Sequence, residues 1–346
     1  MAIEIIATGR AVPLRRLTND DLAKQKQIDT SDEWIRSHTG IGARHIADDS
    51  TACSDLAVEA VKNLFSRAIE TGAVGEKTPE ELARTVDFIL LATSTQDYYS
   101  HPSTSCIVQD RIGAVNAAAM DITAACSGFI YGLETVAGLL GISGKRKRAL
   151  VIGSEVLSRI TDWNDRASCI LFGDGAGAVL VEKTAAPSEG EGRRGLVRSI
   201  LAADGSGAEH LMVRRGGSRN PYRAGEVVDI PPHVDMDGQA VYYFAVKAVT
   251  DTIKNLVQED GISIDDVDII IPHQANARIV NAAGKRIGIP EKKFYLNIDE
   301  YANTSSASIP IALDELAGNG KIARGNLIMT VGFGAGLTYG GNLIVW

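Results

Sequence analysis

The sequence predicts an α/β fold built from two similar halves. Apolar stretches typical of buried strands alternate with helical patterns, for example at residues 55–68 and 246–256. A strand-like segment also recurs, because VDFILL at 86–91 resembles VDIII at 267–271, an offset of 267 − 86 = 181 residues. A second pair of strand-like segments recurs at a similar offset. A duplicated set of βα units leaves this kind of repeat.

The two predicted halves are residues 1–185 and 186–346. The boundary falls in a polar, glycine-rich stretch at residues 185–195, which is typical of a linker. With 346 residues, 45% of them hydrophobic, the chain can bury a large core. We therefore expect two intimate halves of one body and not two independent domains.

Composition excludes several classes of protein. No apolar run approaches 18 residues, so we expect no membrane span, and the N-terminus lacks the basic start of a signal peptide. Four widely spaced cysteines show no disulfide or zinc pattern, which fits a cytoplasmic location. The net charge of −8 argues against a nucleic-acid-binding protein.

Cys126 is the strongest candidate for a reactive residue. Small residues flank it, and an apolar helical pattern follows at Ile130, Leu133, Val136 and Leu140. The cysteine is thus predicted at the start of a helix, where the helix dipole favours a thiolate nucleophile. A small buried cysteine without a chemical role is the alternative.

Two later segments offer partners for such a thiol. His273 follows a short apolar strand and has Gln274 and Asn276 beside it, a position suited to chemistry. Asn303 opens a run of small residues before an apolar helix at residues 309–316, where it either acts in the site or caps the helix. Cysteine, histidine and asparagine suit thioester chemistry, but papain-like hydrolases use the same set.

Seven short motifs, in order along nearly the whole chain, give a specific family resemblance. They are TSDEWI at 30–35, TGI at 39–41, AACSG at 124–128, FGDGAG at 172–177, PHQAN at 272–276, NTSSAS at 303–308 and GFGAG at 332–336. The chain resembles the β-ketoacyl-acyl-carrier-protein synthase III family of the thiolase superfamily. The resemblance implies a thiolase-like fold, with duplicated mixed-sheet halves in a layered αβαβα arrangement.

The resemblance also implies a reaction. An acyl-coenzyme A primer acylates a cysteine, and a decarboxylated malonyl-acyl carrier protein then condenses with it to start fatty-acid synthesis. By the matching motifs the catalytic residues are Cys126, His273 and Asn303. The oxyanion is held by the N–H groups of Cys126 and Ala335, with alanine where the family often has glycine. The family implies no cofactor and no metal, and a homodimer.

Further substrate contacts follow from the same motifs. Trp34 would stack on the adenine of coenzyme A, with His38 where the family usually has an arginine, and Arg166 would contact the coenzyme. Asn276 belongs to the same substrate site, and Phe333 would shield the pocket. A core role for Trp34 and Phe333, and a salt bridge from Arg166 to a neighbouring aspartate, are the alternatives.

A basic stripe follows the catalytic histidine. Arg278, Lys285 and Arg286 are 7 and 8 residues apart and share one helix face, which suits docking of the acidic carrier protein. A solvated helix face is the alternative. Tyr243 stands where the family often has another basic residue. The loop at 96–101 is longer than usual in the family, and could reach across a dimer interface to shape the acyl pocket.

Two alternatives to the leading function stay open. A condensing or acyl-transfer enzyme of secondary metabolism would share the scaffold and the cysteine, and would differ in the thioesters it accepts. A papain-like cysteine hydrolase is disfavoured by the βα pattern around both candidate segments and by the absence of a Cys-Gly-Ser-Cys-Trp-like context.

Overall fold

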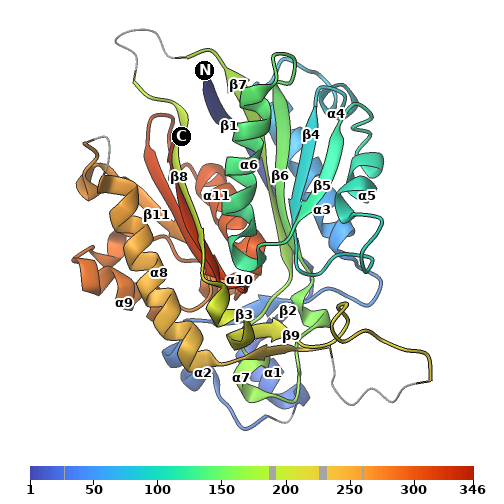
Figure 1. Cartoon of the computed structure of the whole chain (residues 1–346), viewed down its shortest axis with the longest axis vertical. Helices are drawn as coiled ribbons and strands as arrows, with labels where there is room; N and C mark the ends of the chain where they lie inside the picture. Colours follow the sequence, from blue (N-terminus) through green and yellow to red (C-terminus); the bar gives the residue numbers. More distant parts are fainter. Residues whose placement is uncertain (27, 187–191, 226–231, 259–260) are drawn as a thin grey trace.

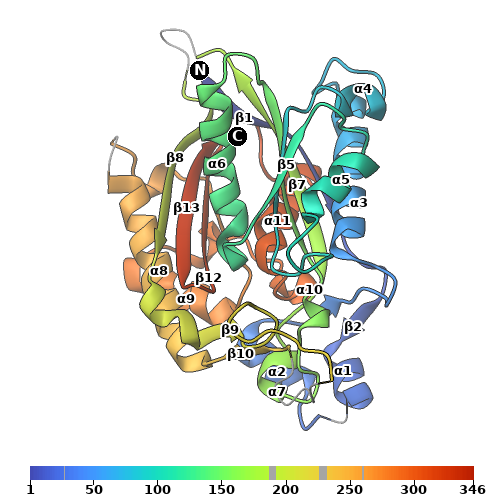
Figure 2. The ribbon, with the colours of Figure 1, turned by 45° about the vertical axis from the view of Figure 1, so that its right-hand side comes forward.

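The structure is a computed structural model that describes residues 1–26, 28–186, 192–225, 232–258 and 261–346. Two β-sheets face each other across a pair of central helices, and further helices cover the outer face of each sheet (Figures 1 and 2). The layers therefore follow the order helix, sheet, helix, sheet, helix. The predicted α/β class and layered arrangement are confirmed.

The first sheet has, in the described chain, the strand order β1-β7-β6-β4-β5. The strands are β1 Ala2–Ala11, β7 Gly175–Thr184, β6 Arg148–Glu155, β4 Phe88–Ala92 and β5 Ala118–Ile122. β4 pairs in parallel with β5 and β6, whereas β7 runs antiparallel to β6 and β1. β4 is a run of five buried apolar residues, as expected for a parallel strand covered on both faces.

The second sheet repeats this arrangement. Its order over the described residues is β11-β12-β13-β8, with β11 Ile269–Pro272, β12 Leu327–Gly334, β13 Thr338–Val345 and β8 Gly195–Ala203. β11 and β12 are parallel and β13 is antiparallel to β12, which matches β4, β6 and β7 in the first sheet. The repeated sequence segments form β4 and β11, so the duplication predicted from them is confirmed.

Helices make up the other three layers. α3 (Cys53–Glu70) covers the outer face of the first sheet, and α8 (Gly238–Gln258) covers the outer face of the second. α6 (Gly128–Ile142) and α11 (Ser308–Gly318) lie between the sheets. The outer layers also contain α4 Pro79–Ala83, α5 Thr104–Arg111 and α9 Ala277–Ile287. The two helical patterns noted in the sequence lie within α3 and α8.

α6 is an unusually apolar helix because it lies between the two sheets. Its predicted face of Ile130, Leu133, Val136 and Leu140 is buried. By length and composition alone, Ala125–Ile142 is the one segment of the described chain that could cross a membrane, and 44% of it is buried inside the fold. The expectation that no apolar segment approaches 18 residues was wrong. The composition suits a helix packed on two sides.

Short elements gather at the end of the molecule where the parallel strands finish (Figure 1). They are β2 Arg16–Thr18, α1 Asn19–Lys26, α2 Asp32–Thr39, β3 Ala43–His45, α7 Arg166–Cys169, β9 Leu211–Val213, β10 Val234–Met236 and α10 Ile298–Tyr301. In α/β sheets, ligands bind outside the carboxyl ends of the strands. This end is therefore where a site is expected.

A buried carboxylate fastens the second half to the first. Asp314 on α11 is fully buried and accepts hydrogen bonds from Thr8 Oγ1 at 2.9 Å and Arg10 Nη1 at 3.0 Å on β1. It also pairs with Arg67 on α3. Removing one partner of a buried ion pair costs about 3–5 kcal/mol, because it leaves an uncompensated charge. The central helix of one half thus depends on the other half for charge compensation.

The chain passes from the first sheet to the second between β7 and β8. β7, in the first sheet, ends at Thr184, and β8, in the second, begins at Gly195. Residues 187–191 of the predicted linker lie outside the described residues. We propose that the halves are 1–185 and 186–346, because the sheet changes across this connection.

Candidate active site

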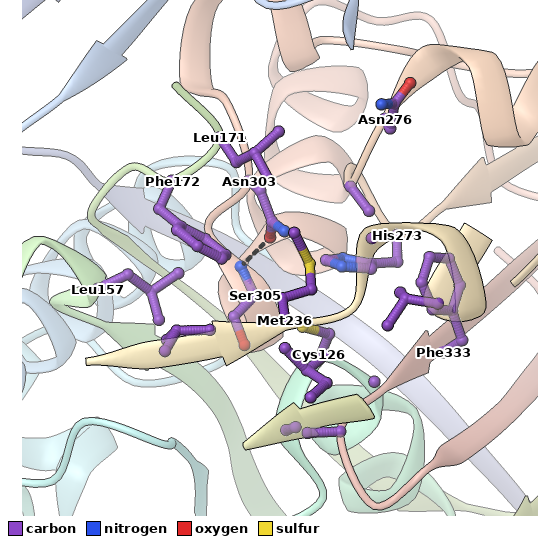
Figure 3. A pocket seen from close by; sticks show the side chains of 18 of the residues that line it. Cys126, Leu157, Leu171, Phe172, Met236, His273, Asn276, Asn303, Ser305 and Phe333 are labelled. Atoms are coloured by element: carbon purple, nitrogen blue, oxygen red, sulfur yellow. Dashed lines mark hydrogen bonds between the residues drawn. The ribbon is translucent and has the colours of Figure 1, made fainter. Parts of the chain in front are cut away.

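A cavity of about 660 Å³ lies at the carboxyl ends of the strands (Figure 3). Both halves line it: Ser94 and Cys126 follow strands of the first sheet, whereas His273 and Phe333 come from strands of the second. The apolar side chains on its wall include Leu157, Ile160, Leu171, Phe172 and Met236. Such a wall suits an apolar substrate group held beside a few polar atoms.

Cys126 lies in the 3₁₀ turn η1 (Ala125–Ser127) that leads into α6. Ala125 has φ 45°, in the left-handed region that costs a residue with a side chain about 1–3 kcal/mol. Gly334 on β12 passes so close that a Cβ there would lie 2.6 Å from the Cys126 nitrogen. Glycine at 334 is therefore needed for β12 to pack against the strained turn that presents the sulfur.

The Cys126 thiol is protonated at rest. Burial raises its pKa to about 12, and the charge of Glu155 adds to the rise, while a hydrogen bond with the Ser305 hydroxyl lowers it in part. The helix start was expected to favour a thiolate, and burial of the sulfur opposes that preference. Loss of water around the sulfur outweighs the partial positive charge of the helix end. A base must therefore take the thiol proton.

His273 is held firmly just after β11. Its N–H donates to the Val331 carbonyl at 2.7 Å, its side chain is buried, and the edge of its ring meets Phe333 with centroids 5.5 Å apart. Burial lowers the pKa of His273 to about 3, so the imidazole is neutral at physiological pH. Its Nδ1 lies 2.8 Å from Ser308 Oγ.

Asn303 has a side-chain orientation fixed by the backbone. Its N–H donates to the Leu171 carbonyl at 2.9 Å, and its carbonyl accepts from the Gly173 N–H at 3.0 Å. Its Oδ1 accepts from the Ser305 N–H at 2.8 Å (Figure 3). Because a backbone N–H only donates, the remaining Nδ2–H₂ group is the donor available to the cavity. Asn303 thus both supports the turn η6 (Ser305–Ala307) and offers a donor.

The structure brings Cys126, His273 and Asn303 to the wall of one cavity (Figure 3). β12 sets the spacing between Cys126 and His273. A Cβ on Gly332 would lie 3.3 Å from the His273 Cβ, and one on Gly334 would touch the Cys126 nitrogen. Alternate residues of a strand share a face about 7 Å apart. Cys126 and His273 therefore both pack on the same face of β12, against alternate residues of that strand.

Ala335 and Phe333 also line this cavity beside Cys126. The Thr338 hydroxyl lies 3.0 Å from the Ala124 carbonyl and 3.1 Å from the Ala335 carbonyl, and so bridges the turn before Cys126 to the loop after β12. This bridge holds together the two segments whose N–H groups are predicted to bind an oxyanion. Phe333 is buried, and its ring packs on His273, so it has both core and cavity contacts.

Of the predicted coenzyme residues, Trp34, His38 and Asn276 line the cavity, and Arg166 packs on Trp34. Trp34 and His38 on α2 stack on each other, with ring centroids 4.2 Å apart. The Arg166 guanidinium lies over Trp34, 4.7 Å from the ring centroid, and donates to the Asp29 carbonyl at 3.0 Å. Asn276 caps α9 by accepting from the Arg278 N–H, and its Nδ2 donates to the His38 carbonyl at 3.1 Å.

The basic stripe lies on α9, near the cavity. Arg278, Lys285 and Arg286 are exposed. Arg278 borders a hollow of about 250 Å³ together with Tyr243, which is 65% exposed, and with Asn276, which also lines the main cavity. The stripe therefore begins beside the cavity and continues along the outer layer of the protein.

The loop at 96–101 packs on its own chain. A Cβ built on Gly217 would lie 3.5 Å from the Tyr99 hydroxyl, and one on Gly216 would lie 3.7 Å from the Tyr99 ring. Tyr98 and Tyr99 still expose more than half of their surface. The predicted role of this loop in another subunit's acyl pocket remains a proposal.

Sequence reasoning missed two buried groups behind the site. Glu155 ends β6, is fully buried, and accepts from the Ser94 N–H at 3.0 Å and the hydroxyls of Thr95 and Ser306 at 2.7 and 2.9 Å. Burial raises its pKa. The second group is Ser308 behind His273. In the sequence, Ser308 is one of several serines in a run and Glu155 is a single glutamate at the end of a strand. Neither has a spacing from other residues that indicates a role in the site.

The described residues contain no group of three or more histidine, cysteine, aspartate or glutamate side chains arranged to hold a metal ion.

Comparisons with known proteins match the whole chain. Residues 120–205 match the model of the 3-oxoacyl-[acyl-carrier-protein] synthase III family, and residues 257–346 match the model of its C-terminal part. A β-ketoacyl-[acyl-carrier-protein] synthase III from Caldanaerobacter subterraneus subsp. tengcongensis is 46% identical, covering 100% of this chain and 98% of that protein.

Solved structures agree with the sequence comparisons. The crystal structure of 3-oxoacyl-[acyl-carrier-protein] synthase III from Aquifex aeolicus VF5 is 39% identical with a TM-score of 0.85, and all of both chains is covered. A priming β-ketosynthase from the R1128 polyketide biosynthetic pathway is 29% identical with a TM-score of 0.86, covering 99% of this chain and 96% of that one.

Proposed function

The chain belongs to the 3-oxoacyl-[acyl-carrier-protein] synthase III family of acyltransferases, and from this we propose that it condenses an acyl-coenzyme A primer with malonyl-acyl carrier protein. The product is a 3-oxoacyl-carrier protein, the first intermediate of fatty-acid synthesis. The observation that carries the proposal is the convergence of Cys126, His273 and Asn303 on one apolar-walled cavity.

In the first half-reaction Cys126 becomes acylated. Its thiolate attacks the thioester carbon, coenzyme A leaves, and an S-acyl-cysteine remains. We assign the N–H groups of Cys126 and Ala335 to the tetrahedral oxyanion, because the Thr338 hydroxyl ties together the segments that carry them. The apolar wall receives the acyl chain.

In the second half-reaction malonyl-carrier protein loses carbon dioxide and leaves an enolate. We assign its oxygen to two donors, His273 Nε2–H and Asn303 Nδ2–H. Asn303 suits this task because its Oδ1 is already committed to the Ser305 N–H, so the amide presents a neutral donor. The enolate carbon attacks the acyl-cysteine, forms the carbon–carbon bond and releases Cys126.

The substrate contacts are proposed from their positions. Trp34, His38, Arg166 and Asn276 would bind the nucleotide end of coenzyme A, since three of them line the cavity and Arg166 packs on Trp34. Arg278, Lys285 and Arg286 would dock the acidic carrier protein. Phe333 would exclude water from the acylated sulfur. The reaction as proposed needs no cofactor or metal, because proton transfer and oxyanion binding suffice for it.

Two further features of the protein are proposed. A homodimer is supported by β5, which lies at the end of the first sheet and carries the partly exposed Met120, with exposed Val115 beside it. A cytoplasmic location is supported by the family's use of coenzyme A thioesters.

A condensing enzyme of secondary metabolism is a second candidate, favoured by the likeness to the R1128 priming β-ketosynthase. The two candidates share the site and differ in the thioesters they accept. The papain-like hydrolase alternative is overturned, because the chain belongs to another family and has another fold.

Intact-protein mass spectrometry tests the proposed function. The protein is incubated with acetyl-, isobutyryl- and longer acyl-coenzyme A, weighed, and then given malonyl-carrier protein. We expect a gain of one acyl group that Cys126→Ala abolishes, followed by its loss with formation of a 3-oxoacyl-carrier protein. Thioester hydrolysis without a malonyl requirement, or acylation of Cys126→Ala, would refute the assignment. Preference for long or unusual primers would favour the second candidate.

A further inference from the structure

Ser308 is the first residue of α11 and sits behind the imidazole of His273. Its side chain is buried, and its Oγ has three hydrogen-bonding neighbours. His273 Nδ1 lies at 2.8 Å, the Ser305 carbonyl at 2.9 Å and the Gln274 backbone N–H at 3.4 Å. Nothing in the reaction described so far uses this hydroxyl.

Two of these neighbours can act only as a donor or only as an acceptor, and together they determine whether His273 Nδ1 donates or accepts. A carbonyl only accepts, so the single hydroxyl proton of Ser308 points to Ser305. The Gln274 N–H only donates, so it uses one lone pair of Oγ. The remaining lone pair of Oγ faces His273 Nδ1. Nδ1 must therefore carry a proton to form the third hydrogen bond of Oγ. A neutral imidazole with its proton on Nδ1 has a bare lone pair on Nε2.

The opposite assignment satisfies fewer groups. If Ser308 donated to Nδ1, Oγ would no longer donate to the Ser305 carbonyl, and Nε2 would carry the proton at rest. That carbonyl would keep only the Ser308 backbone N–H. Buried polar groups are nearly always satisfied as fully as the geometry allows. The hydrogen-bond geometry therefore favours the form with Nε2 bare.

We propose that Ser308 is a positioning residue that keeps the His273 proton on Nδ1, so that Nε2 accepts the thiol proton of Cys126. This inference rests on the proposed function, since it assigns a base to the same nucleophile. His273 then serves both half-reactions. It is a base while Cys126 is acylated, and it is a donor during decarboxylation, when Nε2 is protonated beside the negatively charged malonyl group.

The protons balance over the cycle. The Cys126 S–H bond breaks and its proton forms a bond to Nε2, giving an imidazolium whose Nδ1–H stays on Ser308 Oγ. The coenzyme A thiolate takes the proton from Nε2 as it leaves, so the buried imidazole is neutral again in the acyl-enzyme. When the negatively charged malonyl group enters, Nε2 takes up a proton from solvent, and this Nε2–H donates to the enolate oxygen while carbon dioxide leaves. When the carbon–carbon bond forms, the released Cys126 thiolate takes the Nε2 proton. One proton from solvent is consumed per turnover, as the condensation requires.

The tautomer of His273 in the resting protein can be measured directly. The parent is labelled with ¹⁵N-histidine, and long-range ¹H–¹⁵N spectra distinguish the two ring nitrogens. The His273 signals are assigned by their loss in His273→Asn. We expect a pyrrole-like Nδ1 and a pyridine-like Nε2. A resting protein whose Nε2 carries the proton would overturn the inference, whatever its activity.

Three variants test whether Ser308 sets this tautomer. Ser308→Ala should populate the Nε2–H form and slow acylation of Cys126 roughly ten- to hundredfold, the effect of leaving a buried donor unsatisfied. Ser308→Thr keeps the hydroxyl and should restore the parent tautomer and most of the rate. Ser306→Ala removes a buried hydroxyl from the same turn that contacts Ala92 and Glu155 instead, and should leave the His273 spectrum unchanged.

The outcomes separate this inference from the proposed function. Parent protein that gains no acyl mass refutes the function, whereas the resting tautomer is still readable. An unchanged Nδ1–H tautomer in Ser308→Ala shows that the hydroxyl does not set it, even if the enzyme condenses normally. Should Ser308→Ala fail to fold, the parent spectrum and Ser308→Thr decide the question.

Discussion

Trp34 and His38 lie one helical turn apart on α2 and stack ring on ring, with centroids 4.2 Å apart. His38 therefore covers one face of the indole directly and does not stand opposite it across a slot of adenine width. Arg166 also packs over the indole. An adenine that stacks on Trp34 must displace one of these two side chains. The exposed Arg166 is the easier to move, because among the described residues only the Asp29 carbonyl accepts a hydrogen bond from its side chain.

Replacing Trp34 tests this nucleotide site. Trp34→Ala should raise the KM for acyl-coenzyme A roughly tenfold, because stacking of a base on an aromatic ring is worth about 1–3 kcal/mol. Acylation from an acyl-pantetheine, which lacks the adenine, should change little. Steady-state acylation rates with both donors provide the comparison. An equal loss with both would show that Trp34 supports α2 and does not bind the nucleotide.

The raised pKa of Cys126 predicts a pH dependence. Below a pKa of about 12 the thiolate fraction rises with pH, so alkylation of Cys126 by iodoacetamide should accelerate about tenfold per pH unit between pH 7 and 9. Peptide mapping isolates the signal of Cys126, and Cys126→Ala corrects for the other cysteines. A rate that levels off below pH 8 would mean that a thiolate is already stabilised in the resting protein.

Asn303→Asp separates the two functions of this side chain. The aspartate keeps an oxygen for the Ser305 N–H but loses the Nδ2 donor. We expect malonyl decarboxylation to fall about a hundredfold, since one oxyanion donor is worth about 3 kcal/mol. Self-acylation of Cys126 should be affected less. Acylation and carbon dioxide release are assayed separately. If both rates fell equally, Asn303 would only support the turn η6 and would not act as a donor to the enolate.

Charge reversal on α9 tests carrier-protein docking. Arg278→Glu should raise the KM for malonyl-carrier protein several-fold and leave acylation by free acyl-coenzyme A nearly unchanged, because Arg278 borders the outer hollow. Added salt should weaken use of the carrier substrate by the parent, since exposed charges are screened over about 8 Å at physiological ionic strength. Lys62→Glu, exposed on α3 in the opposite outer layer, is the matched control. A KM for malonyl-carrier protein that does not change with salt concentration would exclude docking by this stripe.

The sequence was most informative where the signal is local. Apolar runs located β4 and β11, helical spacing located α3, α6 and α8, and the motifs located the residues that meet in the cavity. Each of these depends on neighbours in the chain. The fold class and the duplication followed from the same patterns, because periodicity reports which face of an element is buried.

Properties created by packing could not be predicted in this way. The sign of the Cys126 pKa shift depends on how much water surrounds the sulfur once two halves close around it. The partner of His273 Nδ1 comes from α11, 35 residues further along. The stacking of His38 on Trp34 depends on side-chain rotamers. α6 shows the same effect for composition: a helix between two sheets acquires a hydropathy close to that of a membrane segment.

The Asp314 cluster has a consequence for protein engineering. A chimera that joins the first half of this chain to the second half of a relative would combine a nucleophile from one parent with an imidazole from the other. It would also place a foreign α11 against Arg10 and Arg67. Parents that both have an acidic residue at the position of Asp314, and both arginines opposite it, are therefore the compatible ones. Primer preference could then be recombined between relatives without rebuilding the interface between the sheets.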